Sequence, residues 1–118
     1  MPLLHIHSSS QSVNEKVIQE LHQTSAQILA DVLGKSTKYV MVLVNTGSSL
    51  SFAQDDQIPC AYLEVKNIGG FTPEITEKLS GLLCKLIGEK LEIPTNRIYI
   101  EYQNAERHLW GWDGRTFA

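Results

Sequence analysis

The amino-acid sequence predicts an α+β fold, a tandem βαβ repeat that forms a four-stranded sheet with two helices on one face. Two observations predict it. Short runs rich in β-branched and aromatic residues alternate with two longer segments whose apolar residues recur at helical spacing. The order strand, helix, strand also occurs in both halves, and strands joined through a helix run parallel. A chain of 118 residues buries one core, so we expect residues 1–118 to form a single domain.

The first unit begins with the strand "LLHIH" at residues 3–7. Ser12 is expected to cap the first helix, because Glu15 follows three residues later as in a capping box. Gly34 ends this helix in the way typical of a C-terminal glycine. The run "YVMVLVNT" at residues 39–46 is then a strand that is apolar on both faces.

The second unit repeats this order after a polar turn. Its first strand is "CAYLEVKNI" at residues 60–68. Thr72 is the expected cap of the second helix, with Pro73 at the first helical position and Pro94 ending it. The last strand is "RIYIEYQ" at residues 97–103, and an aromatic, glycine-broken tail follows it.

One face of the predicted sheet lacks a cover. Each helix has a single apolar stripe, so the two helices cover only one face, yet residues 39–44 are apolar on both sides. Copies of the same chain packed in a closed ring would cover the second face, with the tail pairing with a neighbour's edge strand. The alternative is that the tail folds back over its own sheet.

Composition excludes two classes of partner. A net charge of -3 and a pI near 5.7 give no basic surface for nucleic acid. The first apolar run is short and lacks a basic leader, so we expect neither a signal peptide nor a membrane span, and a cytoplasmic protein. His5 and His7 share one strand face, but no third ligand is indicated, so we expect no metal site.

Pro2 directly precedes the first predicted strand. Proline is tolerated at the first position of a strand but adds little stability there, because it lacks a backbone N–H. If Met1 is removed, Pro2 carries a free secondary amine. Such an amine is an efficient general base when desolvation and a nearby cation bring its pKa close to the working pH. Two interpretations follow, a catalytic base or a residue that only starts a strand.

Five segments together resemble the macrophage migration inhibitory factor family of the tautomerase superfamily. They are "MP", "GKSTKYVMVLV", "PCAYLEVKNIG", "LLCKLIGEKLEIPTNRIYIEY" and "GWDGRTFA", and they cover nearly the whole chain. The resemblance implies a homotrimer with sheets facing inward and sites between subunits. It also implies keto-enol tautomerase activity on phenylpyruvate-like and dopachrome-like substrates, and we expect no cofactor.

The same resemblance assigns roles in the site. Pro2 is the expected general base, Lys35 the group that holds the substrate carboxylate beside the backbone N–H of Ile68, and Tyr99 a residue that arrives from the adjacent subunit. The expected substrate-binding residues are Lys35, Ile68, Tyr99, Glu101, Tyr39, Asn67, Trp110, Trp112 and Phe117. Ile68 and the aromatic residues of the tail would supply apolar walls that desolvate the amine.

Two departures from the family pattern concern the substrate's aryl end. Glu101 stands where the family commonly has an asparagine, and Trp110 replaces a smaller residue at the pocket rim. Anionic or bulky aryl ends should therefore bind worst.

Two further interpretations stay open beside the tautomerase. One is a cytokine-like signalling or binding protein with a vestigial pocket, because a fold does not settle function. The other is dehalogenation, which in the superfamily uses pocket arginines. None of Arg97, Arg107 and Arg115 matches such a role by position.

Overall fold

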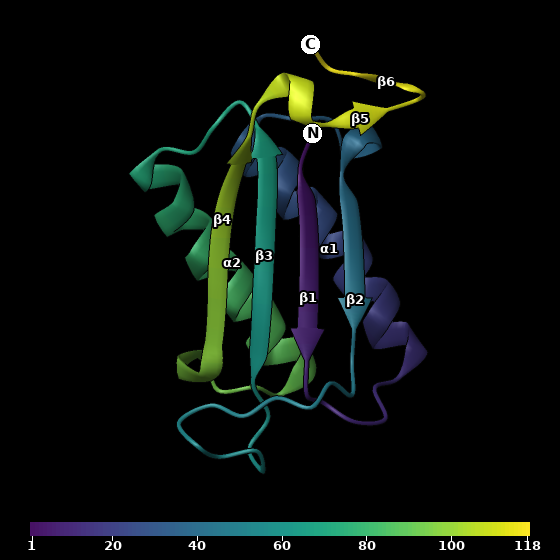
Figure 1. Cartoon of the computed structure of the whole chain (residues 1–118). Coiled ribbons are helices and arrows are strands. Elements are labelled where there is room, and N and C mark those ends of the chain that lie inside the picture. The colour runs from purple at the N-terminus through teal and green to yellow at the C-terminus, as the bar shows by residue number, and fades with distance from the viewer.

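The computed structural model describes all of residues 1–118. The four long strands are β1 (Leu3–Ser8), β2 (Met41–Asn45), β3 (Ala61–Ile68) and β4 (Ile98–Ala105), and the two helices are α1 (Glu15–Leu33) and α2 (Pro73–Leu91) (Figure 1). The tail adds β5 (Gly111–Trp112) and β6 (Arg115–Thr116), and the short 3-10 helices are η1 (Thr37–Tyr39), η2 (Thr95–Arg97) and η3 (Arg107–Leu109). The predicted tandem βαβ repeat is confirmed.

The sheet has the order β2-β1-β3-β4. Both strand pairs joined through a helix are parallel, as predicted: β1 with β2, and β3 with β4. The two units meet along β1 and β3, which are antiparallel, with Leu3 opposite both Met41 and Lys66. One end of the sheet therefore gathers the starts of β1 and β2 and the ends of β3 and β4.

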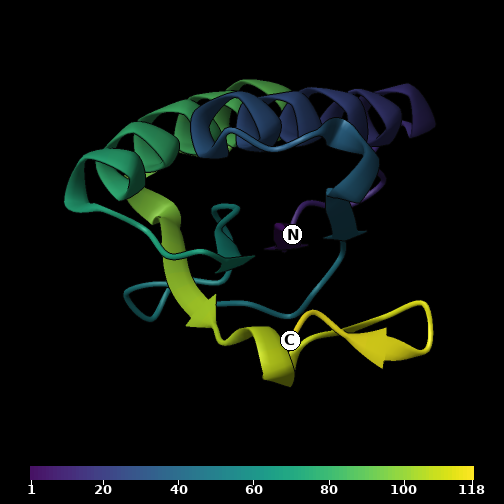
Figure 2. The same ribbon diagram turned by 90° about the horizontal axis from the view of Figure 1, so that it is seen from above.

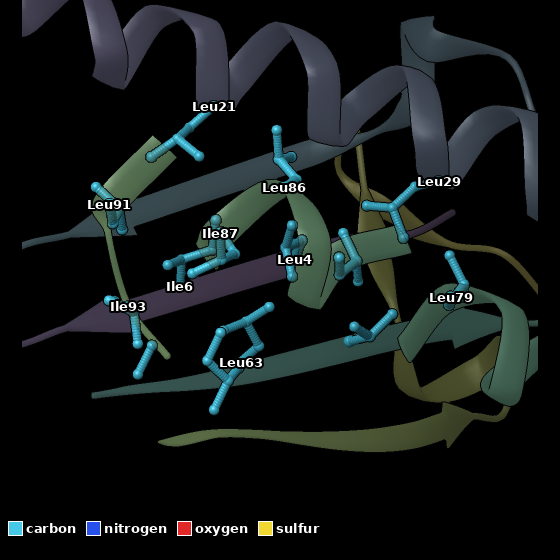
Figure 3. Packing of buried hydrophobic residues seen from close by; sticks show 14 residues of the cluster. Leu4, Ile6, Leu21, Leu29, Leu63, Leu79, Leu86, Ile87, Leu91 and Ile93 are labelled. Carbon is cyan, nitrogen blue, oxygen red and sulfur yellow. The ribbon is translucent and has the colours of Figure 1, made fainter. Parts of the chain in front are cut away.

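The core lies between the sheet and the two helices, which cover the same face (Figure 2). Its central side chains, shown in Figure 3, are Leu4, Ile6, Leu21, Leu29, Leu63, Leu79, Leu86, Ile87, Leu91 and Ile93. Alternate residues of β1 and β3 are buried, because successive side chains of a strand point to opposite faces. Neither helix is both long and apolar enough to cross a membrane.

The helix ends agree with the sequence at two places and differ at two others. Gly34 ends α1 in the left-handed conformation, and the hydroxyl of Thr72 accepts from the N–H of Ile75 at the start of α2, both as predicted. The prediction that Ser12 caps α1 is wrong. Asn14 is the cap, because Ser12 lies in a turn with a φ of 53°. Helix α2 ends at Leu91, before Pro94, with Glu92 as its left-handed cap.

The face of the sheet away from the helices is largely open. Strand β2 begins at Met41, two residues later than predicted, because Tyr39 belongs to η1. Met41 is 63% exposed and Leu43 is 42% exposed on this face. The tail lies on the same side, across the end of the sheet near the N-terminus (Figures 1 and 2). It forms its own short hairpin there and leaves these two side chains uncovered.

Candidate active site

Two hollows flank the N-terminus at this end of the sheet. The first, of about 410 Å³, is lined by Met1, Pro2, Leu3, Lys38, Tyr39, Val40, Met41, Trp110, Gly111, Trp112 and Phe117. The second, of about 260 Å³, is lined by Met1, Lys35, Ile68, Gly69, Arg107 and Phe117. Met1 and Phe117 border both. The first residue of the chain thus borders both a mostly apolar hollow and a hollow lined by two cations, Lys35 and Arg107.

Pro2 is fixed by the sheet next to these hollows. Its ring is fully buried, and its carbonyl accepts a hydrogen bond of 3.1 Å from the N–H of Met41. Pro2 needs no N–H for this pairing, which is consistent with proline at the first position of a strand. The hydrogen bond to β2 therefore fixes the backbone of Pro2, while Met1 borders both hollows.

Lys35 reaches its hollow because α1 ends directly before it. The left-handed Gly34 turns the chain, and the N–H of Lys35 donates to the carbonyl of Ala30 at 2.9 Å. The Lys35 ammonium nitrogen lies 3.6 Å from the point where a Cβ atom on Gly69 would stand. Gly69 has a φ of +107°, so another residue there would strain the backbone, and its Cβ atom would lie in van der Waals contact with this ammonium group.

Asn67 and Asn104 brace the glycine turn that follows β3. The side-chain amide of Asn67 donates to the carbonyl of Gly70 at 3.2 Å, and the N–H of Gly70 donates to Oδ1 of Asn104 at 2.9 Å. Both bonds tie the turn to the ends of β3 and β4. Asn67 itself lines neither hollow, so in this chain it supports the wall beside Lys35 from behind.

The tail supplies an aromatic wall. The rings of Trp112 and Phe117 are stacked with centroids 6.0 Å apart, and Tyr39 meets Trp112 edge-on at 6.1 Å. The N–H of Phe117 donates to the carbonyl of Trp110 at 3.2 Å, and Nε of Arg107 donates to the carbonyl of Phe117 at 3.0 Å. These bonds hold the end of the tail against η3, so the wall is a folded element.

The N-terminal amine, carried here by Met1, has a pKa below its ordinary value. Burial is the largest cause, followed by the positive charges of Lys35 and then Arg107. Each disfavours the ammonium form, because burial removes water from the charge and a neighbouring cation repels it. A larger share of the amine is therefore neutral near pH 7, which is the state in which it accepts a proton.

Seven of the residues expected in the site lie together around the two hollows. They are Pro2, Lys35, Tyr39, Ile68, Trp110, Trp112 and Phe117. Tyr99 and Glu101 lie elsewhere on the open face, opposite Tyr62 and Glu64 of β3. Tyr99 is 65% exposed and meets Phe52 edge-on at 5.1 Å. Its expected place in the site of an adjacent subunit stays a prediction.

Arg107 lines the second hollow, although the sequence assigned it no site position. The topology of the sheet explains its place there. Strands β3 and β4 are parallel and end at the same edge, with Ile68 opposite Ala105, so the residues directly after β4 lie beside the wall that Ile68 forms. Lys38 and Met41 also line the first hollow without having been predicted. The absence of a pocket arginine therefore no longer argues against dehalogenation.

His5 and His7 lie side by side on the open face, with ring centroids 3.8 Å apart and the ring planes inclined at 37°. Nε2 of His5 lies 2.8 Å from the side-chain amide nitrogen of Asn45, and Nε2 of His7 lies 4.0 Å from a carboxylate oxygen of Glu64. No three His, Cys, Asp or Glu side chains gather at one point that would hold a metal ion. The pair stands apart from the two hollows.

Fold and site together define a class: small α+β proteins of two βαβ units in which the first residue lines a pocket at the end of the sheet. The sequence model of the family "Macrophage migration inhibitory factor (MIF)" matches residues 1–118. The homolog from Trichinella spiralis is 37% identical over 97 residues, which cover 82% of this chain and 83% of that protein. The chain belongs to the macrophage migration inhibitory factor family, as the resemblance of its segments indicated.

Solved structures agree with this assignment. The crystal structure of the homologue from Prochlorococcus marinus has a TM-score of 0.87 and 37% identity, and the match covers 98% of this chain and 99% of that one. The structure from Toxoplasma gondii has a TM-score of 0.91 at 28% identity, over 97% of this chain and 98% of that one.

Proposed function

We propose that this protein is a keto-enol tautomerase of phenylpyruvate-like α-keto acids, with dopachrome-like compounds as further substrates. Its general base is the amine of Pro2, freed when Met1 is removed. The observation that carries the proposal is the place of the N-terminus, between an aromatic hollow and a cationic one. Met1 lines both hollows, so its loss would join them around the new amine.

The residues around the amine have complementary roles in this reaction. Neutral Pro2 takes a proton from the carbon next to the ketone. The C–H electron pair becomes a C=C bond, and the carbonyl pair moves onto oxygen. Return of the proton to oxygen gives the enol, and its return to carbon gives the ketone. Lys35 holds the carboxylate, and the wall of Tyr39, Trp112 and Phe117 packs on the aryl ring.

A homotrimer with sheets facing inward is part of the proposal. The exposed Met41 and Leu43 lie on a sheet face that the chain does not cover itself, which supports burial against further copies. In such a ring Tyr99 and Glu101, which lie outside the hollows of their own chain, would reach the site of a neighbour.

The test is an N-terminal extension. Trimmed protein beginning at Pro2 is compared with a variant that has one alanine ahead of Pro2, which turns the amine into an amide without basicity. General base catalysis contributes ~10²- to 10⁴-fold in rate, so kcat/KM toward phenylpyruvate should fall by about that factor while the melting temperature stays nearly unchanged.

Pro2→Gly, which keeps an N-terminal amine in primary form, is the matched control and should retain more activity than the extended protein. An extended protein with more than about a tenth of the original kcat/KM would show that Pro2 is not the base. Mass spectrometry that finds Met1 on the active protein would have the same meaning. Trimmed protein that does not turn over phenylpyruvate would favour a binding protein with an inactive pocket.

A further inference from the structure

Arg107 and Lys35 are two cations without an anionic partner in the same hollow. Neither has a carboxylate within 4.0 Å. Nε of Arg107 donates to the carbonyl of Phe117, whereas the two terminal guanidinium nitrogens of Arg107 make no hydrogen bond within the chain. The side chain is exposed to solvent while it lines the hollow. One edge of the guanidinium is thus held by the tail, and the other is free to bind.

Arg97 shows what an arginine with a structural role looks like in this protein. It is buried, and its three nitrogens donate to four backbone carbonyls, those of Phe52, Asp55, Ile58 and Pro59. Arg107 makes a single such bond. The contrast indicates that Arg107 has donors available for a ligand.

The proposed reaction creates a second negative charge directly beside the first. An α-keto acid enters with one negative charge, on its carboxylate. When the amine takes the proton, the substrate becomes a dianion, because the carbonyl electron pair moves onto oxygen. Lys35 balances one of the two charges. The ammonium ion that Pro2 forms in the same step carries a positive charge that is lost again when the proton returns to the substrate. The carboxylate and the ketone oxygen of an α-keto acid are adjacent, so a second cation in the same hollow reaches the other.

We propose that Arg107 is a second catalytic cation, which binds the developing enolate oxygen while Lys35 holds the carboxylate. The inference rests on the proposed tautomerase and specifies its substrate class: α-keto acids whose enolates carry two neighbouring negative charges. Fixed donors aimed at charge that develops in the transition state accelerate a reaction more than they strengthen substrate binding.

A binding experiment tests the anion site without turnover. Oxalate, with two adjacent carboxylates, reproduces the charge pattern of the enolate, whereas acetate carries one charge. Charge-assisted hydrogen bonds of this kind make a difference of ~10- to 100-fold in affinity. We expect Arg107→Ala to weaken oxalate binding to trimmed protein by that factor in calorimetry, and acetate binding by less than about threefold.

Arg115→Ala is the matched control, since it removes the same charge from the same tail at a position that lines neither hollow. It should leave both affinities unchanged. Equal losses of oxalate affinity in the two variants would show that Arg107 acts only through the overall surface charge, and would contradict the proposal. Unchanged oxalate binding in Arg107→Ala would overturn the proposal outright.

Kinetics separate catalysis from simple binding. Arg107→Ala should lower kcat toward phenylpyruvate about 10- to 100-fold with little change in KM, and Arg107→Lys should restore part of it. Arg107→Ala should raise the pKa of the amine at the mature N-terminus, because Arg107 is one of the two cations that lower the pKa of the N-terminal amine in the untrimmed chain. The other ionisable groups that line the hollows are Lys35, Lys38 and Tyr39, and all are kept.

The two proposals fail in different ways. If Arg107→Ala turns over phenylpyruvate like the trimmed parent protein, the tautomerase stands and the role of Arg107 falls. If the parent protein is inactive but binds oxalate in an Arg107-dependent way, the tautomerase and the catalytic role fall together, and an anion-binding site remains.

Discussion

Arg97 should be the polar side chain whose loss destabilises the fold most. It lies on η2, directly before β4, and ties down the loop between β2 and β3. Its guanidinium group donates four hydrogen bonds to backbone carbonyls of this loop. Nε donates to the carbonyl of Pro59 at 3.2 Å and Nη1 to that of Phe52 at 3.1 Å. Nη2 donates to the carbonyls of Asp55 at 2.8 Å and Ile58 at 2.9 Å. The guanidinium also lies over the Phe52 ring, 5.5 Å from its centroid.

The magnitude follows from these contacts. A hydrogen bond to a charged group contributes ~1.5–3 kcal/mol, so four bonds set an upper bound of about 6–12 kcal/mol. The loop lies at the surface and its carbonyls regain water when Arg97 is truncated, and the buried cation no longer needs to be desolvated. We therefore expect Arg97→Ala to lower the free energy of unfolding by about 2–4 kcal/mol, within the range of single-site losses that have a definite structural cause.

Urea unfolding at one fixed protein concentration measures this loss, as a lower midpoint with an unchanged slope. Arg97→Lys keeps the charge but not the fork of donors, and should lose about half as much. Amide exchange of residues 52–59 should accelerate in Arg97→Ala, since the loop loses its anchor. A free energy of unfolding within about 0.5 kcal/mol of the parent protein would refute the reasoning, as would a loss equal to that of the exposed Arg115→Ala.

Three further predictions concern the site and the assembly. Lys35→Ala should raise KM for phenylpyruvate about tenfold or more, because a charge-assisted contact with the carboxylate is lost, and should affect a phenylpyruvate ester much less. Equal effects on the acid and the ester in steady-state assays would show that the substrate carboxylate does not bind Lys35. Glu101→Asn should improve turnover of aryl substrates that carry a negative charge relative to neutral ones, and an unchanged ranking would show that Glu101 faces no substrate. Light scattering should give three times the chain mass at micromolar concentration, and a monomer mass would contradict the trimer.

Local chemistry made some elements predictable and left others open. Gly34 and Thr72 mark their helix ends because a left-handed cap and a side-chain acceptor are local requirements. Ser12 and Asn14 are both suitable caps, and the choice between them depends on how the chain turns after β1. That turn is a property of the whole fold, so two residues of error at this helix end have a tertiary cause.

The candidate site residues that could be predicted are those in segments that resemble the family. Pro2, Lys35 and Phe117 match family segments, and the structure brings all three to one end of the sheet. Arg107 was not predicted to line the site, because its position depends on the order of the strands in the sheet. The antiparallel junction of β1 and β3 follows a connection, residues 46–60, that has no periodic pattern. Without that junction, the ends of β3 and β4, and therefore Arg107, cannot be placed beside the N-terminus at the start of β1.

The burial of Pro2 limits when the proposed removal of Met1 can take place. Its ring is inside the folded protein and its carbonyl is bonded to Met41, so the start of β1 is no longer an extended, accessible peptide once the sheet has formed. An aminopeptidase needs such a peptide in its active site. The partners that close around β1 begin at Met41 and end with β3, so they leave the ribosome well after Met1 does. If Met1 is removed, as the proposed function requires, the removal takes place on the nascent chain, and a molecule that folds first keeps the nitrogen of Pro2 in an amide bond.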